Sequence, residues 1–137
     1  MTQSVDIQKY FDFVDATTSH PSKNTDEFIR RVEKIRDEQN QNISRLLTGA
    51  VGLSCESGEF LEIVKKIVFQ GKELNDANRE HLIVEMGDIM WYFAQACMAL
   101  GITMDEVLIR NTVKLSARYP EGTFDVYRSE NRREGDI

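Results

Sequence analysis

Two pairs of acidic residues, Glu56 with Glu59 and Glu85 with Asp88, have the spacing in this chain that points most directly to chemistry. The members of each pair are three residues apart, so on a helix they project from one face. If the two helices pack together, the four carboxylates repel one another unless a divalent cation neutralises them. Ligands that are all oxygen favour Mg²⁺ or Mn²⁺ over zinc. The spacing therefore predicts a Mg²⁺ site in which Mn²⁺ is a possible substitute.

The elements that position these acids are predicted to be long helices. The chain has 137 residues with only two prolines and eight glycines, and most of the glycines lie near the ends of helix-periodic segments. We expect an all-α fold with a four-helix core and an extra short N-terminal helix. The predicted helices cover about residues 5–18, 26–47, 51–69, 79–100 and 104–118, with a loop at 19–24. Gly49 and Gly52 mark either a break or a close contact between helices.

All 137 residues are expected to form one domain, because a chain of this length builds a single hydrophobic core. Its motif-bearing part covers about residues 26–122, and residues 125–137 form a charged tail that we expect to be mobile. Thr103 is the predicted cap of the last core helix, and Gly101 ends the helix before it.

Composition argues against several classes of protein. A net charge of −6 is unlike the basic stripe of a protein that binds nucleic acid polymers. No apolar run is long enough to span a membrane, and the polar start is unlike a signal peptide, so we expect a soluble cytoplasmic protein without a membrane partner. Cys55 and Cys97 lie in apolar helical patterns and are expected to be buried free thiols.

The helix that carries Glu85 and Asp88 is predicted to be apolar on two sides. Its expected core face contains Leu82, Ile83, Met86, Ile89, Met90, Phe93, Ala94 and Cys97, with the two acids at the border. Val84, Trp91 and Met98 recur on the other side at intervals of seven residues. Either Trp91 packs against the N-terminal helix of its own chain, or this side is a subunit interface of a homo-oligomer, a dimer or a tetramer.

A single pair of acids on a helix is usually part of a solvated surface. Here both pairs border apolar faces and lie on consecutive helices that can pack antiparallel, so each pair strengthens the interpretation of the other.

Three segments resemble the MazG-like all-α nucleoside triphosphate pyrophosphohydrolases, in particular the short single-domain proteins of bacteriophages. Residues 52–59 (GLSCESGE) are similar to the first acidic motif of that family, and residues 85–92 (EMGDIMWY) are similar to the second. Residues 111–120 (NTVKLSARYP) add a third similarity, and the three blocks occur in the family's order. The chain departs from the family pattern at Cys55, where many members have a glutamate.

The resemblance implies hydrolysis of (deoxy)nucleoside triphosphates between the α and β phosphates, which releases the monophosphate and pyrophosphate. Mg²⁺ held by Glu56, Glu59, Glu85 and Asp88 would stabilise the transferring phosphoryl group. Glu59 or Glu56 is the candidate catalytic residue that polarises the attacking water. If a phage encodes the chain, the host cytoplasm is its expected location.

The resemblance also implies residues that bind the substrate. Asn111 and Lys114 are expected to contact it, and Arg118 and Tyr119 are further candidates on the same segment. The alternative is that these side chains are exposed polar residues of a helix surface.

Three residues near the acids have alternative roles. Tyr92, one turn after Asp88, is a candidate for stacking on the base. Lys66 either binds phosphate or forms a surface ion pair with Glu62. His81, one turn before Glu85, could contact phosphate or fix a carboxylate, but we favour a histidine at a helix start with no ligand role.

Two further interpretations of function remain open. The chain could be a dUTPase-like or dCTPase-like member of the same superfamily, which would differ only in base preference. It could also be a metal-stabilised helical module with an interaction or regulatory role and no turnover.

Overall fold

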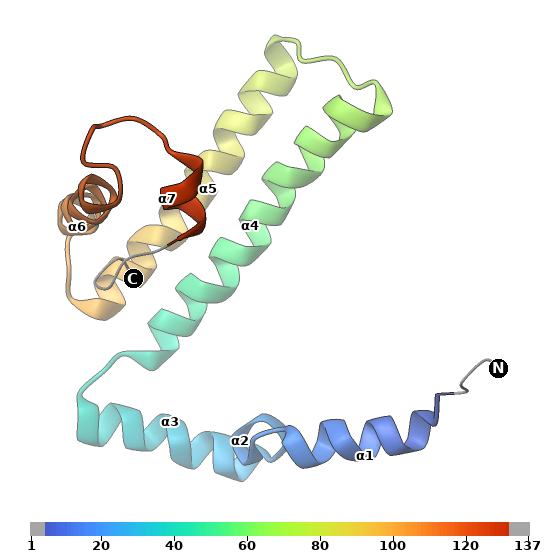
Figure 1. Ribbon diagram of the computed structural model, residues 1–137. Coiled ribbons are helices and arrows are strands. Elements are labelled where there is room, and N and C mark those ends of the chain that lie inside the picture. Colours follow the sequence, from blue (N-terminus) through green and yellow to red (C-terminus); the bar gives the residue numbers. More distant parts are fainter. Residues whose placement is uncertain (1–4, 132–137) are drawn as a thin grey trace. The chain divides into compact units, whose positions relative to one another are not determined.

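The computed structural model describes residues 5–131 and contains only helices and their connections within that range. The helices are α1 (Ile7–Thr17), α2 (His20–Lys23), α3 (Thr25–Gln39), α4 (Ile43–Gln70), α5 (Asp76–Leu100), α6 (Met104–Arg118) and α7 (Val126–Glu130) (Figure 1). The predicted all-α class is confirmed. The chain divides into two compact units, Met1–Ile43 and Ser44–Ile137. The assignment of all residues to one domain stays a prediction.

The first unit contains α1, α2 and α3. The predicted loop at residues 19–24 was partly wrong, because α2 forms there with Pro21 in its first turn, where proline is tolerated. Lys23 Nζ lies 3.0 Å from Asp15 Oδ2 and links α2 back to α1. Asn24 caps α3, and its side chain accepts a hydrogen bond from the Glu27 backbone N–H at 3.0 Å.

The predicted helix at residues 26–47 was wrong in its second half. α3 ends at Gln39, and Asn40 adopts a left-handed conformation with φ 51°. Asparagine tolerates this conformation better than most residues. The backbone N–H of Gln41 then bonds to the carbonyl of Ile35, which closes the helix end. The apolar residues from Ile43 to Leu47 therefore begin α4 instead of continuing α3.

The second unit is built on an antiparallel hairpin of α4 and α5, the green and yellow helices of Figure 1. Gly71, with φ 71°, ends α4, and the N–H of Lys72 bonds to the Lys66 carbonyl. Asn75 caps α5 by accepting a hydrogen bond from the Asn78 N–H at 3.0 Å. This cap places the start of α5 at Asp76, three residues before the predicted start.

Gly49 and Gly52 make a close contact between α4 and α5 and do not break α4. A methyl group added at Gly49 would lie 3.0 Å from the backbone nitrogen of Ala96. One added at Gly52 would lie 2.0 Å from Cδ1 of Tyr92. Small residues at these positions therefore let the two helices approach.

The predicted core face of α5 was partly wrong. Ile83, Met86 and Met90 are exposed, whereas Cys97 and Ala99 are buried. The side of α5 that meets α4 is centred on Glu85, which retains 6% of its accessible surface. The prediction placed the acid at the border because it took the apolar residues alone to mark the buried side of the helix. A buried carboxylate cannot be found in this way, because it is not apolar.

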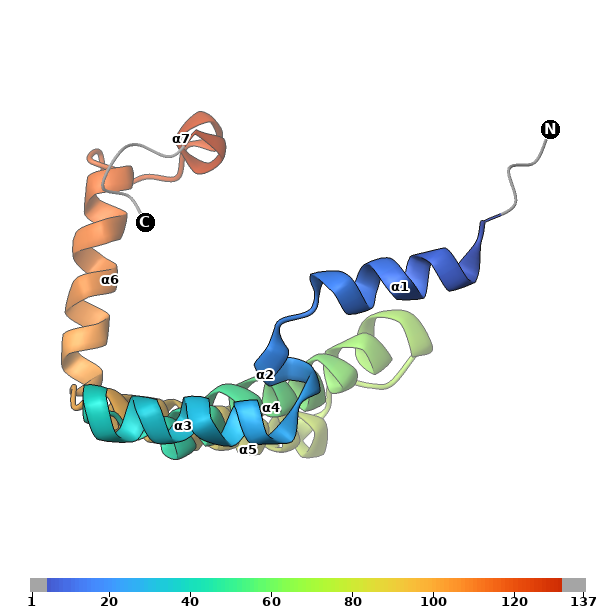
Figure 2. The same cartoon turned by 90° about the horizontal axis from the view of Figure 1, so that it is seen from below.

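α6 begins at the predicted Thr103 cap, and the axes of α5 and α6 meet at 93° after Gly101 (Figure 2). The tail predicted to be mobile contains α7, and its Arg128 side chain pairs with Glu121 in the connection that follows α6. Residues 132–137 of that tail lie outside the described residues. Among residues 5–131 no single helix passes the length and hydropathy test for a membrane span, although α5 and α6 taken together do.

Candidate metal centre

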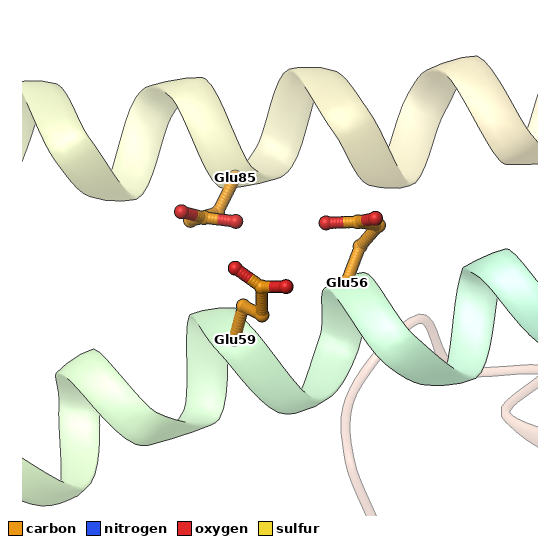
Figure 3. A group of neighbouring side chains, drawn as sticks. All are labelled: Glu56, Glu59 and Glu85. Carbon is orange, nitrogen blue, oxygen red and sulfur yellow. The ribbon is translucent and has the colours of Figure 1, made fainter.

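Three glutamates converge between α4 and α5. Glu56 and Glu59 project from consecutive turns of α4, and Glu85 reaches toward them from α5 (Figure 3). One carboxylate oxygen of each lies within 4.8 Å of the others. Glu85 is buried, Glu56 is half-buried and Glu59 is exposed. The structure thus brings together three of the four predicted metal ligands in a site that is shielded on one side and open on the other.

The spacing of these oxygens fits a divalent cation of the size of Mg²⁺. Oxygen ligands bind Mg²⁺ at about 2.0–2.1 Å, so ligands on opposite sides of the ion are about 4.2 Å apart. The three oxygens all lie within 4.8 Å of one another, which is close to the separation that such an ion requires. The donor set is all carboxylate, which suits Mg²⁺ and Mn²⁺ better than zinc.

The pKa of Glu56 reflects the electrostatics of the group. Partial desolvation raises it above its ordinary value of 4.5, and the charges of Glu59, Asp88 and Glu85 raise it further. Desolvation and neighbouring negative charges both disfavour the ionised carboxylate. A bound cation would reverse this effect, because it favours the ionised form.

Asp88, the fourth predicted ligand, lies outside the group of three. It is exposed on α5, one turn after Glu85, although its charge contributes to the raised pKa of Glu56. Its role as a metal ligand therefore stays a prediction.

A pocket of about 310 Å³ opens beside the carboxylates. It is lined by residues of α4 and α5 only, namely Cys55, Gly58, Glu59, Glu62, Ile63, Lys66, His81 and Glu85. Lys66 Nζ lies 3.2 Å from Glu62 Oε1, and Lys65 pairs with the same glutamate. The predicted ion pair of Lys66 is present, and the same side chain borders the pocket where a phosphate would be needed.

His81 contacts the buried glutamate of the site. Its Nε2 lies 3.0 Å from Oε1 of Glu85, four residues later on α5. This contact favours the alternative that His81 fixes a carboxylate, and the expectation that it has no ligand role stays a prediction. The sequence carried a signal for it, since the spacing of four residues on a helix brings two side chains together.

The other predicted substrate residues do not line this pocket. Tyr92 is half-buried, with its ring against Gly52 in the packing of α4 on α5. Asn111, Lys114, Arg118 and Tyr119 lie on or just after α6. Tyr119 instead lines a second pocket, of about 290 Å³, near the end of α6. The substrate roles of these residues stay predictions.

Cys55 differs from its expected environment. It is exposed and lines the pocket, whereas Cys97 is buried as predicted. Cys55 directly precedes Glu56, on the part of α4 that faces solvent beside the acids, so the helical pattern alone did not place it.

The part of the chain that carries the acids is similar to known proteins. The MazG nucleotide pyrophosphohydrolase domain matches residues 41–123, which include α4, α5 and α6. The "Gene 37 protein" of Mycobacterium phage L5 is 39% identical over 74 residues. That alignment covers 53% of this chain and 64% of the phage protein, so the chain matches less than two thirds of its relative. No solved structure matches the chain.

Proposed function

The chain belongs to the MazG nucleotide pyrophosphohydrolase family, and we propose that it uses Mg²⁺ to hydrolyse (deoxy)nucleoside triphosphates between the α and β phosphates. The products would be a nucleoside monophosphate and pyrophosphate. The convergence of Glu56, Glu59 and Glu85 within 4.8 Å is the observation that carries this proposal.

A divalent cation at this group supplies charge neutralisation for the triphosphate and for the phosphoryl group in the transition state. Glu85 is the least exposed of the three and is suited to anchor the cation from α5. Glu56 is expected to hold the cation from α4, and the fall in its pKa on cation binding favours that role. Asp88 is proposed as a further ligand that joins when the cation is bound.

Glu59 is the better candidate for orienting the attacking water. Its side chain is exposed and borders the pocket, so one of its oxygens can face solvent while the other faces the cation. A carboxylate that is not fully committed to metal can accept a proton from water.

The phosphates need cationic partners as well. Lys66 borders the pocket and is proposed to contact them, in exchange for part of its ion pair with Glu62. We propose that the site is completed by Asn111, Lys114, Arg118 and Tyr119. A neighbouring subunit of a homo-oligomer can supply these residues. Tyr92 packs against α4, and we propose that the edge of its ring contacts the base.

Substitution of the acids by amides tests the proposal. Glu59→Gln and Asp88→Asn keep the size of the side chain and remove its charge, so we expect the fold to persist. Losing several kcal/mol of transition-state stabilisation lowers kcat/KM by about 100-fold or more. Glu80→Gln is the matched control, because Glu80 is an exposed acid of α5 outside the pocket. Rates near wild type for Glu59→Gln would contradict the proposed role of this acid.

A further inference from the structure

We propose that His81 is a positioning residue that holds the buried Glu85 carboxylate in the orientation needed to bind the cation. The inference deepens the proposed function and rests on it. In this arrangement the ring Nε2–H donates to one oxygen of Glu85, and the second oxygen is directed toward the acids of α4.

The geometry of the pair supports this role. His81 Nε2 lies 3.0 Å from Glu85 Oε1, within the usual range for an N–H donor and an oxygen acceptor. An ionised carboxylate only accepts hydrogen bonds, so the nitrogen that faces it must carry the proton. Nε2 carries that proton both in one neutral tautomer and in the charged ring, so the role does not require a change of protonation.

The two side chains differ strongly in exposure. The side chain of Glu85 keeps 8% of its surface, whereas that of His81 keeps 52%. The imidazole therefore lies at the rim of the site, with its outer edge toward solvent, and reaches inward to an acid that little water can reach. In the described part of the chain no other ion pair to Glu85 is present.

A fixed orientation matters because Glu85 is the one ligand that α5 contributes to the group of three. Glu56 and Glu59 come from α4 and approach from the other side (Figure 3). Partners that hydrogen-bond to a ligating carboxylate typically change metal affinity by 10-fold to 100-fold when they are removed. His81 also borders the same pocket as Glu59 and Glu85, so its contact lies at the site itself.

An ordinary helix ion pair is the competing explanation. Pairs four residues apart on a helix surface stabilise the helix without any role in a site. The two explanations differ in what a substitution changes. A surface pair affects the stability of the fold, and a positioning residue affects the affinity for the cation.

The test compares three variants of the full chain by the dissociation constant for Mn²⁺, measured without nucleotide by electron paramagnetic resonance. His81→Leu removes the donor, and His81→Gln restores an N–H at the same number of bonds from the backbone. Arg79→Ala removes a positive charge from the same turn of α5 and lies outside the pocket. Circular dichroism checks that each variant is folded, which we expect because the side chain of His81 is half exposed.

We expect His81→Leu to bind Mn²⁺ roughly ten-fold more weakly, while His81→Gln and Arg79→Ala stay within about two-fold of wild type. If His81→Leu binds Mn²⁺ with wild-type affinity, the inference about His81 is wrong, whereas the proposed metal site is unaffected. Equal weakening in His81→Gln, or in Arg79→Ala, would also overturn the inference, because the donor would then not be the cause. If the wild-type chain binds no Mn²⁺, the proposed metal site fails and the inference fails with it.

Discussion

At the scale of single residues, the repulsion between the acids contributes to the raised pKa of Glu56. Desolvation and the charges of Glu59, Asp88 and Glu85 raise its pKa. In the folded state the protonated form is thus favoured relative to the unfolded chain. The stabilising effect of protonation is fully present below the ordinary value of 4.5 and is lost as the pH rises through the raised pKa.

Replacing Glu56 should therefore stabilise the protein when no cation is present. Above the raised pKa, Glu56→Gln removes the repulsion, and its melting temperature in a chelator should exceed that of the wild type. The difference should vanish well below pH 4.5, where Glu56 is protonated in both the folded and the unfolded chain and is as neutral as the amide. Added Mg²⁺ should stabilise the wild type more than the variant. Thermal unfolding at several pH values measures both effects, with Glu80→Gln as a control.

A variant that is less stable than wild type at pH 8 in chelator would show that Glu56 makes a favourable contact in the cation-free fold. That result would contradict the repulsion between acids on which the metal centre is based.

Sequence reasoning at this scale found the acids but not their surroundings. The three-residue spacing identified Glu56, Glu59 and Glu85, because a helix places such pairs on one face. It did not predict the burial of Glu85, since burial depends on the neighbouring helix and not on the residue itself. The contact of His81 with Glu85 needed only the helix spacing, but its significance depends on that burial.

At the scale of elements, the hairpin of α4 and α5 determines the geometry of the site. Gly52 allows α4 to approach the ring of Tyr92, one turn before Glu56 on the same helix. A side chain at this position would push α4 away from α5 and separate the acids of the two helices. The close contact therefore connects the packing of the hairpin to the cation site.

Gly52→Ala should destabilise the protein, because the new methyl group would lie 2.0 Å from Cδ1 of Tyr92. Overpacking of this kind costs about 1–3 kcal/mol, more than the 0.5–1 kcal/mol, roughly, that alanine gains over glycine in a helix. Gly58→Ala on the same helix meets no atom within 4 Å and should be stabilising by that smaller amount. Urea unfolding measures both free energies. Equal effects of the two substitutions would contradict the close packing at Gly52.

The ends of helices were predictable where a residue has a strong conformational preference. Gly101 and the cap at Thr103 were identified from the sequence, and the structure confirms them. The end of α3 was missed because Asn40 is less specific than glycine and lies between two apolar segments that together have helical spacing. The choice between a break and a close contact at Gly49 required the position of the partner helix.

At the scale of the whole molecule, large apolar side chains remain exposed on the outer side of α5. Val84, Trp91 and Met98 keep 52%, 55% and 59% of their surface and recur every seven residues. Such a stripe on one helix is typical of an interface between helices. In a homo-oligomer a second copy of the chain would cover this stripe, and the homo-oligomer stays a prediction.

Sedimentation at low micromolar concentration should show a dimer or a tetramer. Trp91→Lys places a charge in the centre of the stripe and should shift the protein toward monomer. Met86→Lys is the matched control, because Met86 is equally exposed, at 55%, on another side of α5. A wild-type chain that sediments only as a monomer would contradict the interface, and dissociation by Met86→Lys alone would place it elsewhere.

The measurement that tests the central proposal most directly is product analysis after incubation of the wild-type chain with a panel of nucleoside triphosphates and Mg²⁺. Hydrolysis between the α and β phosphates yields monophosphate and pyrophosphate in equal amounts, and a chelator that removes Mg²⁺ should abolish both. A folded protein that turns over none of the triphosphates in the presence of Mg²⁺, or that releases diphosphate and orthophosphate instead, would contradict the proposed function.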